Sequence, residues 1–134
     1  MDGIITTWVI TWRIAAALVV AAGLILLAPI GGLVPKVREW FPPFWMVAVP
    51  LAAPLSIIVW SGANWARESG QGTSYATTVH TGLFVGCLVL CVVWPFLMRR
   101  ARGIGWILGA AVVGFLYSWA AWFVGGMAIT NVWL

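Results

Sequence analysis

Two ionisable side chains, Arg13 and His80, lie inside long apolar stretches and are the first candidates for chemistry. An ionisable residue within a membrane-spanning segment is a functional-site hypothesis by default, because placing its charge in lipid is costly. A guanidinium binds anions through several N–H donors, and an imidazole can donate, accept or ligate. At similar predicted depth, Arg13 and His80 could together hold an anionic or carbonyl-bearing ligand.

Several hydroxyl-bearing residues fall near these two, and together they predict an outward-facing polar pocket. Its ligand could be a lipid headgroup, a quinone or the propionate of a tetrapyrrole. The hydroxyl residues expected to line it beside Arg13 and His80 are Thr11, Thr77, Thr78, Thr81, Tyr117 and Ser118. The alternative is that each candidate acts alone. Arg13 would then extend its charge to lipid phosphates, and His80 would make a local hydrogen bond.

The donor set for a metal or a cofactor is incomplete within this chain. Cys87 and Cys91 have the four-residue helical spacing of two ligands to one metal, but a closed thiolate site needs about four donors. His80 is displaced from Cys87 by about 10 Å along a helix axis. The sequence therefore predicts no metal site and two cysteines that act as small apolar residues. His80 could give one axial bond to a haem or a chlorophyll-type pigment, although the sequence requires no cofactor.

The sequence lacks the short motifs of common enzyme classes. It has no serine nucleophile elbow, no HExxH and no phosphate-binding glycine loop. It also has no Asp or Glu inside an apolar stretch, where a proton-coupled or cation-coupled carrier would place its exchangeable site. The chain is therefore expected not to be an enzyme on its own.

The elements that must position the candidates are four apolar stretches, at residues 7–30, 44–62, 76–98 and 104–128. Hydrophobic residues make up 63% of the 134, and the mean hydropathy is +1.06. Each stretch is near the roughly 20 helical residues that cross a bilayer. The sequence predicts an all-α integral membrane protein, a four-helix bundle in a single domain over 1–134. Its longest exposed segment is the loop 63–75, either a connector or a docking place for a partner.

The distribution of basic residues predicts how the bundle is oriented. Positive charge favours the cytoplasmic side of a membrane. The basic residues between the first and second stretches and between the third and fourth are Lys36, Arg38, Arg99, Arg100 and Arg102. Only Arg13 and Arg67 lie toward the other side, so both termini and the loop 63–75 are expected outside an inner (plasma) membrane. Because these cations flank helix ends, nucleic acid is not an expected partner.

Small residues predict which helix faces pack. Gly82 and Gly86 form a GxxxG pair that allows close approach of another backbone. The nearly opposite stripe would face a ligand, a partner subunit or a neighbouring helix, and consists of His80, Phe84, Cys87 and Cys91. In the last stretch, Ala110 and Gly114 are the expected packing positions.

Prolines distinguish the second stretch from the others. Pro50 and Pro54 lie inside it, where each removes a backbone hydrogen bond. They indicate a packing feature, with a hinge as the alternative. Every tryptophan except Trp119 maps toward a predicted helix end, which is typical of anchoring at the membrane interface.

Two functions remain from this reading. The first is a non-catalytic accessory or anchor subunit of a larger membrane complex, for example an energy-transducing one, with other membrane subunits and the lipid bilayer as partners. The second is a transporter or channel for small solutes built from several copies of the chain. We favour the first, because the inner halves of the stretches carry almost no polar residue that could line a pore.

Overall fold

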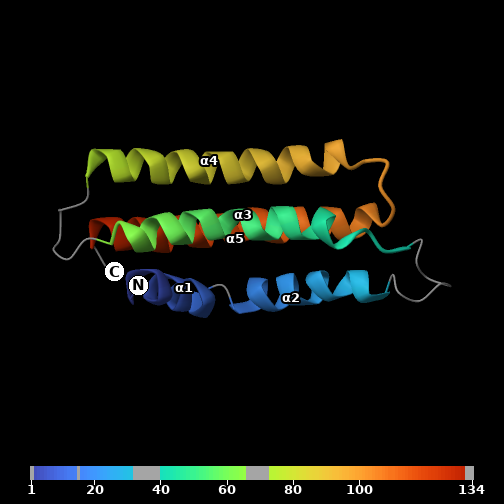
Figure 1. The fold of residues 1–134 in the computed structure, drawn as a ribbon, viewed down its shortest axis with the longest axis horizontal. Coiled ribbons are helices and arrows are strands. Elements are labelled where there is room, and N and C mark those ends of the chain that lie inside the picture. Colours follow the sequence, from blue (N-terminus) through green and yellow to red (C-terminus); the bar gives the residue numbers. More distant parts are fainter. Residues whose placement is uncertain (1, 15, 32–39, 66–72, 132–134) are drawn as a thin grey trace.

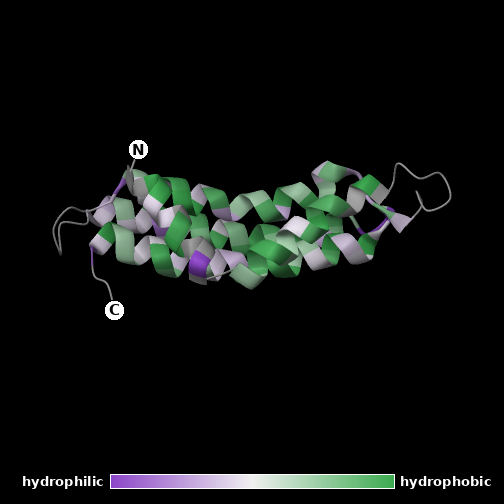
Figure 2. Ribbon diagram, turned by 90° about the horizontal axis from the view of Figure 1, so that it is seen from below, coloured by the Kyte–Doolittle hydropathy of each residue, from purple (hydrophilic) through white to green (hydrophobic). Residues whose placement is uncertain are grey.

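The computed structural model describes residues 2–14, 16–31, 40–65 and 73–131. The elements in these ranges are helices α1 (Asp2–Ile14), α2 (Ala16–Gly31), α3 (Phe44–Ala63), α4 (Ser74–Leu97) and α5 (Ile104–Thr130). They run along one long axis, and the start of α1 and the end of α5 lie at the same end of the molecule (Figure 1). Helices α3, α4 and α5 are long and apolar enough to cross a membrane. Hydrophobic residues extend along most of the bundle (Figure 2).

The last three predicted spans agree with the observed helices to within two residues at each end, whereas the first does not. The predicted helix 7–30 is two shorter helices, α1 and α2, on either side of residue 15, which lies outside the described residues. They follow one another along the α3–α5 pair (Figure 1). Hydropathy measures only the length of an apolar run, so it cannot show where a helix divides.

Helices α3 and α5 form the centre of the bundle. They make the most extensive helix pair, with α4 against one side and α1 and α2 against the other (Figure 1). One buried cluster includes Ile57, Phe84 and Tyr117, and a second, toward the opposite end, includes Val47 and Ile107. Because lipid tails are as apolar as these side chains, the bundle depends on close packing and hydrogen bonds between helices.

Side chains of α4 supply hydrogen-bond donors in place of those that prolines remove from α3. Proline has no N–H, so Pro50 and Pro54 leave the carbonyls of Met46 and Pro50 without their usual helical donors. The indole Nε1 of Trp94 donates to the Met46 carbonyl over 2.8 Å. The thiol of Cys91 lies 4.0 Å from the Pro50 carbonyl, as a weak donor. These contacts tie α3 to α4 where no water can replace the lost bonds.

The second cysteine makes a similar contact one turn away. Cys87 donates from its thiol to the carbonyl of Ala53 over 3.3 Å and lies 3.8 Å from the hydroxyl of Ser56. Both thiols are free and buried. Cys87 and Cys91 therefore line the α3–α4 contact as small side chains with a weak donor.

The connection between α4 and α5 is short and depends on one glycine. Gly103 has a φ of +64°, the left-handed region that disfavours residues with a Cβ. A Cβ there would also lie 2.6 Å from Pro42 and 2.7 Å from the carbonyl oxygen of Trp40. This turn fixes where α5 begins relative to the chain that enters α3.

Helix α1 docks on α3 through a backbone contact at Gly62. A Cβ on Gly62 would overlap the backbone of Ile4, which cannot move aside as a side chain could. We expect Gly62→Ala to raise hydrogen exchange of the α1 amides about tenfold, because overpacking costs about 1–3 kcal/mol. Exchange in α4 and α5 should not change. Gly23→Ala is the matched control, since no atom lies within 4 Å of its Cβ; equal exchange in both variants would contradict the observed docking.

Candidate functional site

His80 lies in the first half of α4 and joins this helix to α5. Its Nε2 is 3.0 Å from the carbonyl oxygen of Trp122. A carbonyl can only accept, so Nε2 carries the proton and donates, which leaves Nδ1 as an acceptor. Only 2% of the His80 side chain is exposed. His80 is thus an interior group that faces the neighbouring helix.

A chain of aromatic contacts begins at the imidazole and joins α4 to α5. The rings of His80 and Trp122 are stacked with centroids 6.5 Å apart, and Phe84 stacks on Trp122 at 5.1 Å. Trp119 meets Phe84 edge to face at 4.8 Å. These separations are within the range of favourable aromatic pairs. These ring contacts hold α4 against α5 beside His80.

Three helices meet at the imidazole. A Cβ on Gly125 of α5 would lie 2.5 Å from Cε1 of His80 and 2.5 Å from the hydroxyl oxygen of Ser61 on α3. Ser61 is fully buried and donates to the carbonyl of Ile57 in its own helix. Glycine at 125 is therefore what allows a histidine and a serine to approach α5 at the same level.

Two buried polar atoms in this cluster have no hydrogen-bond partner within the described part of the chain. They are Nδ1 of His80 and Nε1 of Trp122. An unsatisfied buried polar group costs about 1–3 kcal/mol. Because one atom is an acceptor and the other a donor, the chemistry available here is hydrogen bonding to a small polar molecule or uptake of a proton at Nδ1.

Arg13 is not part of this cluster. It lies in the last turn of α1, and its side chain is exposed on the surface of the bundle. Helix α1 packs against α3 and α5, on the side of that pair away from α4 (Figure 1). The structure therefore does not bring Arg13 and His80 together, although the sequence predicts a similar membrane depth for both.

The threonines predicted for the pocket lie toward the start of α4 and face outward. Thr77 donates to the carbonyl of Thr73 over 3.3 Å, and Thr78 donates to that of Ser74 over 2.8 Å. Thr81 is also exposed. These side chains satisfy the first turns of α4 or lie on its outer surface, so they do not surround the imidazole.

The hydroxyl residues predicted on α5 are buried. Tyr117 belongs to the cluster that contains Phe84 and Cys87. Ser118 donates to the carbonyl of Gly114 over 2.8 Å. Thr11 lies on α1, and its side chain is outside the described part of the structure. The predicted pocket residues are therefore divided between the interior of the bundle and its surface.

The small residues predicted for packing are also divided. Ala110 and Gly114 are buried on α5, and a Cβ on Gly114 would overlap the carbonyl of Pro50 and lie 3.2 Å from the thiol of Cys91. In contrast, Gly82 and Gly86 lie on the outer side of α4, with no atom within 4 Å of a Cβ at either position. The stripe from His80 to Cys91 is the inward face of α4, so any close packing at this glycine pair involves something other than the described residues.

The described residues hold no group of three or more His, Cys, Asp or Glu side chains that could bind a metal ion. An axial bond from His80 to a haem or a chlorophyll-type pigment would have to use Nε2, which is bonded to Trp122, or the buried Nδ1. Either requires the α4–α5 contact to open.

Sequence reasoning missed Trp122, Ser61 and Gly125 as neighbours of His80. Trp122 was interpreted only as an interface anchor, because its hydropathy and position near a helix end fit that role. The prolines of α3, four residues apart, leave adjacent turns without donors and imply donors on a facing helix, which points to Trp94 and Cys91 and not to the neighbours of His80. Comparison with protein-family models, with curated protein sequences and with solved structures finds no match to this chain.

The neighbouring glycines of α5 test the three-helix contact. We expect Gly125→Ala to destabilise the protein by about 1–3 kcal/mol through overpacking against His80 and Ser61. Gly126→Ala should be neutral or slightly stabilising, because its nearest neighbour, Nε2 of His80, is 4.0 Å from the Cβ. Thermal unfolding in detergent measures the difference. Equal midpoints for the two variants would show that His80 does not occupy this position.

Proposed function

We propose that this chain is a non-catalytic accessory or anchor subunit of a larger complex in an inner (plasma) membrane. The observation that carries the proposal is the open glycine pair of α4. Gly82 and Gly86 have the spacing that lets two membrane helices approach closely, yet no part of the described chain occupies that face. A partner helix from another polypeptide is the occupant that this spacing suits.

The surface around the pair is shaped for such a helix. Helices α3 and α4 border a hollow of about 740 Å³ here. Its lining residues are Val49, Ala52, Ala53, Ser56, Val79, Gly82, Leu83, Gly86, Cys87 and Leu90. Five of these residues are alanine, glycine or serine, and small side chains allow close backbone contact and weak Cα–H···O bonds. Another helix could therefore contact this hollow mainly through van der Waals packing, with few hydrogen bonds.

The interior of the bundle favours a structural role over transport. His80, Ser61 and Ser118, three of the buried polar residues, each make a hydrogen bond to helix backbone. Solute pathways are normally lined by polar or charged groups that face water. Of the residues predicted to contact an outward-facing ligand, we therefore retain only Arg13 in this proposal. Its exposed guanidinium suits a lipid headgroup.

Replacing the glycine pair should release the partner. We expect Gly82→Leu with Gly86→Leu to abolish co-migration with other polypeptides when the protein is isolated in mild detergent, because the added side chains hold the partner backbone away. Gly23→Leu, at another exposed glycine of a helix, is the control and should leave the complex intact.

Three outcomes would contradict this proposal. They are migration of the wild-type chain alone, retention of partners by the double variant, and a complex containing only copies of the chain that moves a small solute across liposomes. The last would establish the alternative function, a homo-oligomeric transporter or channel. A visible absorption band in the isolated complex would identify a pigment held by the partner subunits or shared with them.

The orientation proposed for this subunit has both termini outside and the arginines of the α4–α5 turn in the cytoplasm. We expect a membrane-impermeant maleimide added to intact cells to label Ser74→Cys and not Gly105→Cys. Both positions are exposed, at the starts of α4 and α5 respectively. The wild-type chain is the unlabelled control because Cys87 and Cys91 are buried. Labelling of Gly105→Cys alone would reverse the orientation.

A further inference from the structure

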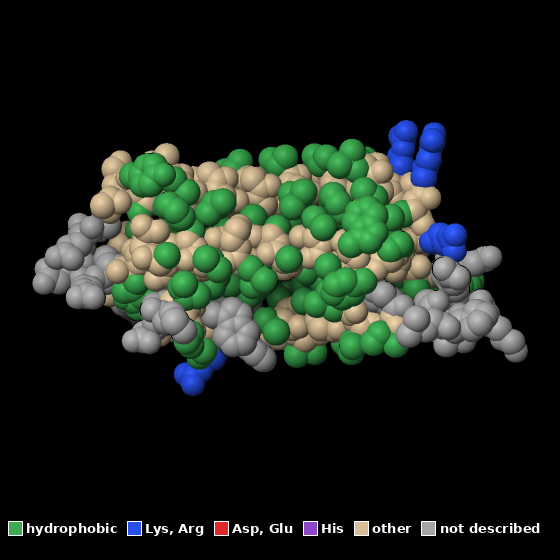
Figure 3. Space-filling view, viewed as in Figure 1, with side chains coloured by type: hydrophobic (Ala, Val, Ile, Leu, Met, Phe, Trp, Pro, Cys, Tyr) green, Lys and Arg blue, Asp and Glu red, His purple; other side chains and the backbone are tan. Residues whose placement is uncertain are grey.

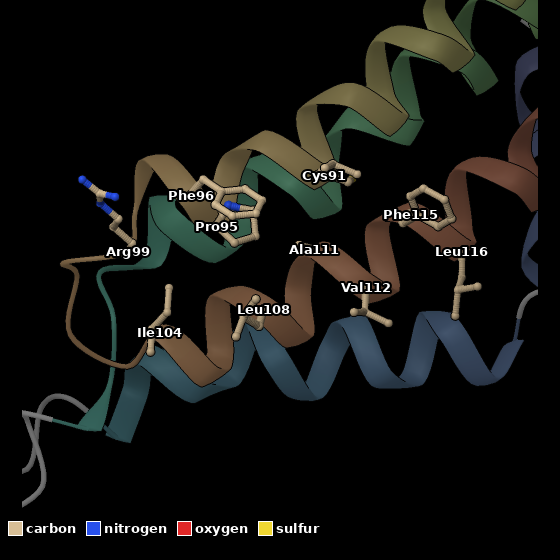
Figure 4. Close-up of a pocket in the computed structure, with 11 residues that line it drawn as sticks. Cys91, Pro95, Phe96, Arg99, Ile104, Leu108, Ala111, Val112, Phe115 and Leu116 are labelled. Atoms are coloured by element: carbon tan, nitrogen blue, oxygen red, sulfur yellow. The ribbon is translucent and has the colours of Figure 1, made fainter.

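A second hollow lies between α4 and α5 at the basic end of the bundle, away from the glycine pair. Its volume is about 400 Å³ (Figure 4). The residues that line it are Cys91, Val92, Pro95, Phe96, Arg99, Ile104, Leu108, Ala111, Val112, Phe115 and Leu116. All but Arg99 are apolar. We call this hollow the α4–α5 groove.

The groove has a charged end and an apolar body. Arg99 follows the last turn of α4, and Ile104 begins α5 just across the turn (Figure 4). From there the lining continues along α5 to Leu116. Twelve residues of helix rise by about 18 Å, close to the roughly 15 Å depth of hydrocarbon in one leaflet. An extended acyl chain would therefore fit along its length.

Positive charge is concentrated at the mouth of the groove. Arg99, Arg100 and Arg102 are all exposed there, and Figure 3 shows blue side chains gathered at this end of the molecule. No Asp or Glu occurs in the sequence at 40–65 or 73–131. The short turn at Gly103 places the three arginines within five residues of Ile104, where α5 begins. A ligand with one anionic head and a long apolar tail complements this arrangement in both charge and shape.

We propose that the α4–α5 groove binds one anionic phospholipid, with an acyl chain against α5 and the phosphate held by the arginines of the turn. Guanidinium groups bind phosphate oxygens through charge-assisted hydrogen bonds. Basic pockets between transmembrane helices are known to recognise anionic headgroups. A zwitterionic lipid offers the same tail but adds a cation beside the arginines, so the groove discriminates by headgroup charge.

The experiment measures lipid retention by native mass spectrometry. The purified chain in detergent is given equal amounts of phosphatidylglycerol and phosphatidylcholine with identical acyl chains. We expect one phosphatidylglycerol to be retained in preference. The double variant Arg99→Gln with Arg100→Gln should lose this preference by about tenfold, since each basic residue contributes to anionic-lipid binding. Arg67→Gln, which removes a cation from the segment between α3 and α4, should retain the lipid as the wild type does.

A second pair of variants tests the apolar body of the groove with the charges unchanged. Leu108→Trp should fill the groove and reduce phosphatidylglycerol retention, whereas Val89→Trp, at an exposed position of α4 outside the lining, should not. Equal retention of the two lipids by the wild type would overturn the proposal. So would unchanged retention in the arginine double variant, or in Leu108→Trp, which would mean that lipid only adheres to a charged surface. None of these outcomes depends on the partner contact at Gly82 and Gly86.

Discussion

The bundle depends on one constraint of the lipid environment: a backbone carbonyl that loses its helical donor must find another within the protein. Helix α3 contains two such carbonyls because of Pro50 and Pro54. In α4, the indole of Trp94 and the thiol of Cys91 are the donors that they contact. The same carbonyl of Pro50 faces Gly114, where the absence of a side chain lets α5 come close. The positions of all three long helices are thus fixed around one irregular turn of α3.

These contacts inside the bundle determine which helix surfaces are left free to bind a partner or a ligand. The face of α4 that carries His80 and the cysteines is used to hold the bundle together, which leaves the opposite face, with Gly82 and Gly86, toward the membrane. The groove at the basic end is a second surface with different chemistry. Under the proposed function, these two surfaces would supply the partner contact and the lipid contact of the chain.

Length and hydropathy predict α3, α4 and α5 well, because a membrane-spanning helix needs about 20 apolar residues whatever its neighbours are. The same argument failed to divide residues 7–30, since α1 and α2 are both apolar. Helical periodicity correctly placed Gly82 and His80 on different faces, but periodicity cannot show which neighbour a face meets. Depth alone likewise suggested that Arg13 and His80 share a pocket, whereas their helices lie on different sides of the α3–α5 pair. The proline positions do indicate one helix contact, because they specify where Trp94 and Cys91 of α4 must donate to α3.

The order of the helices along the chain has a consequence for biogenesis. Helix α5 packs against all four other described helices, yet the ribosome makes it last among them. Until it emerges, His80 lacks the Trp122 carbonyl, and the α5-facing sides of α1 to α4 meet lipid or the insertion machinery instead. Insertion and assembly are therefore separate steps for this protein. The bundle formed by the five described helices closes only after translation of α5.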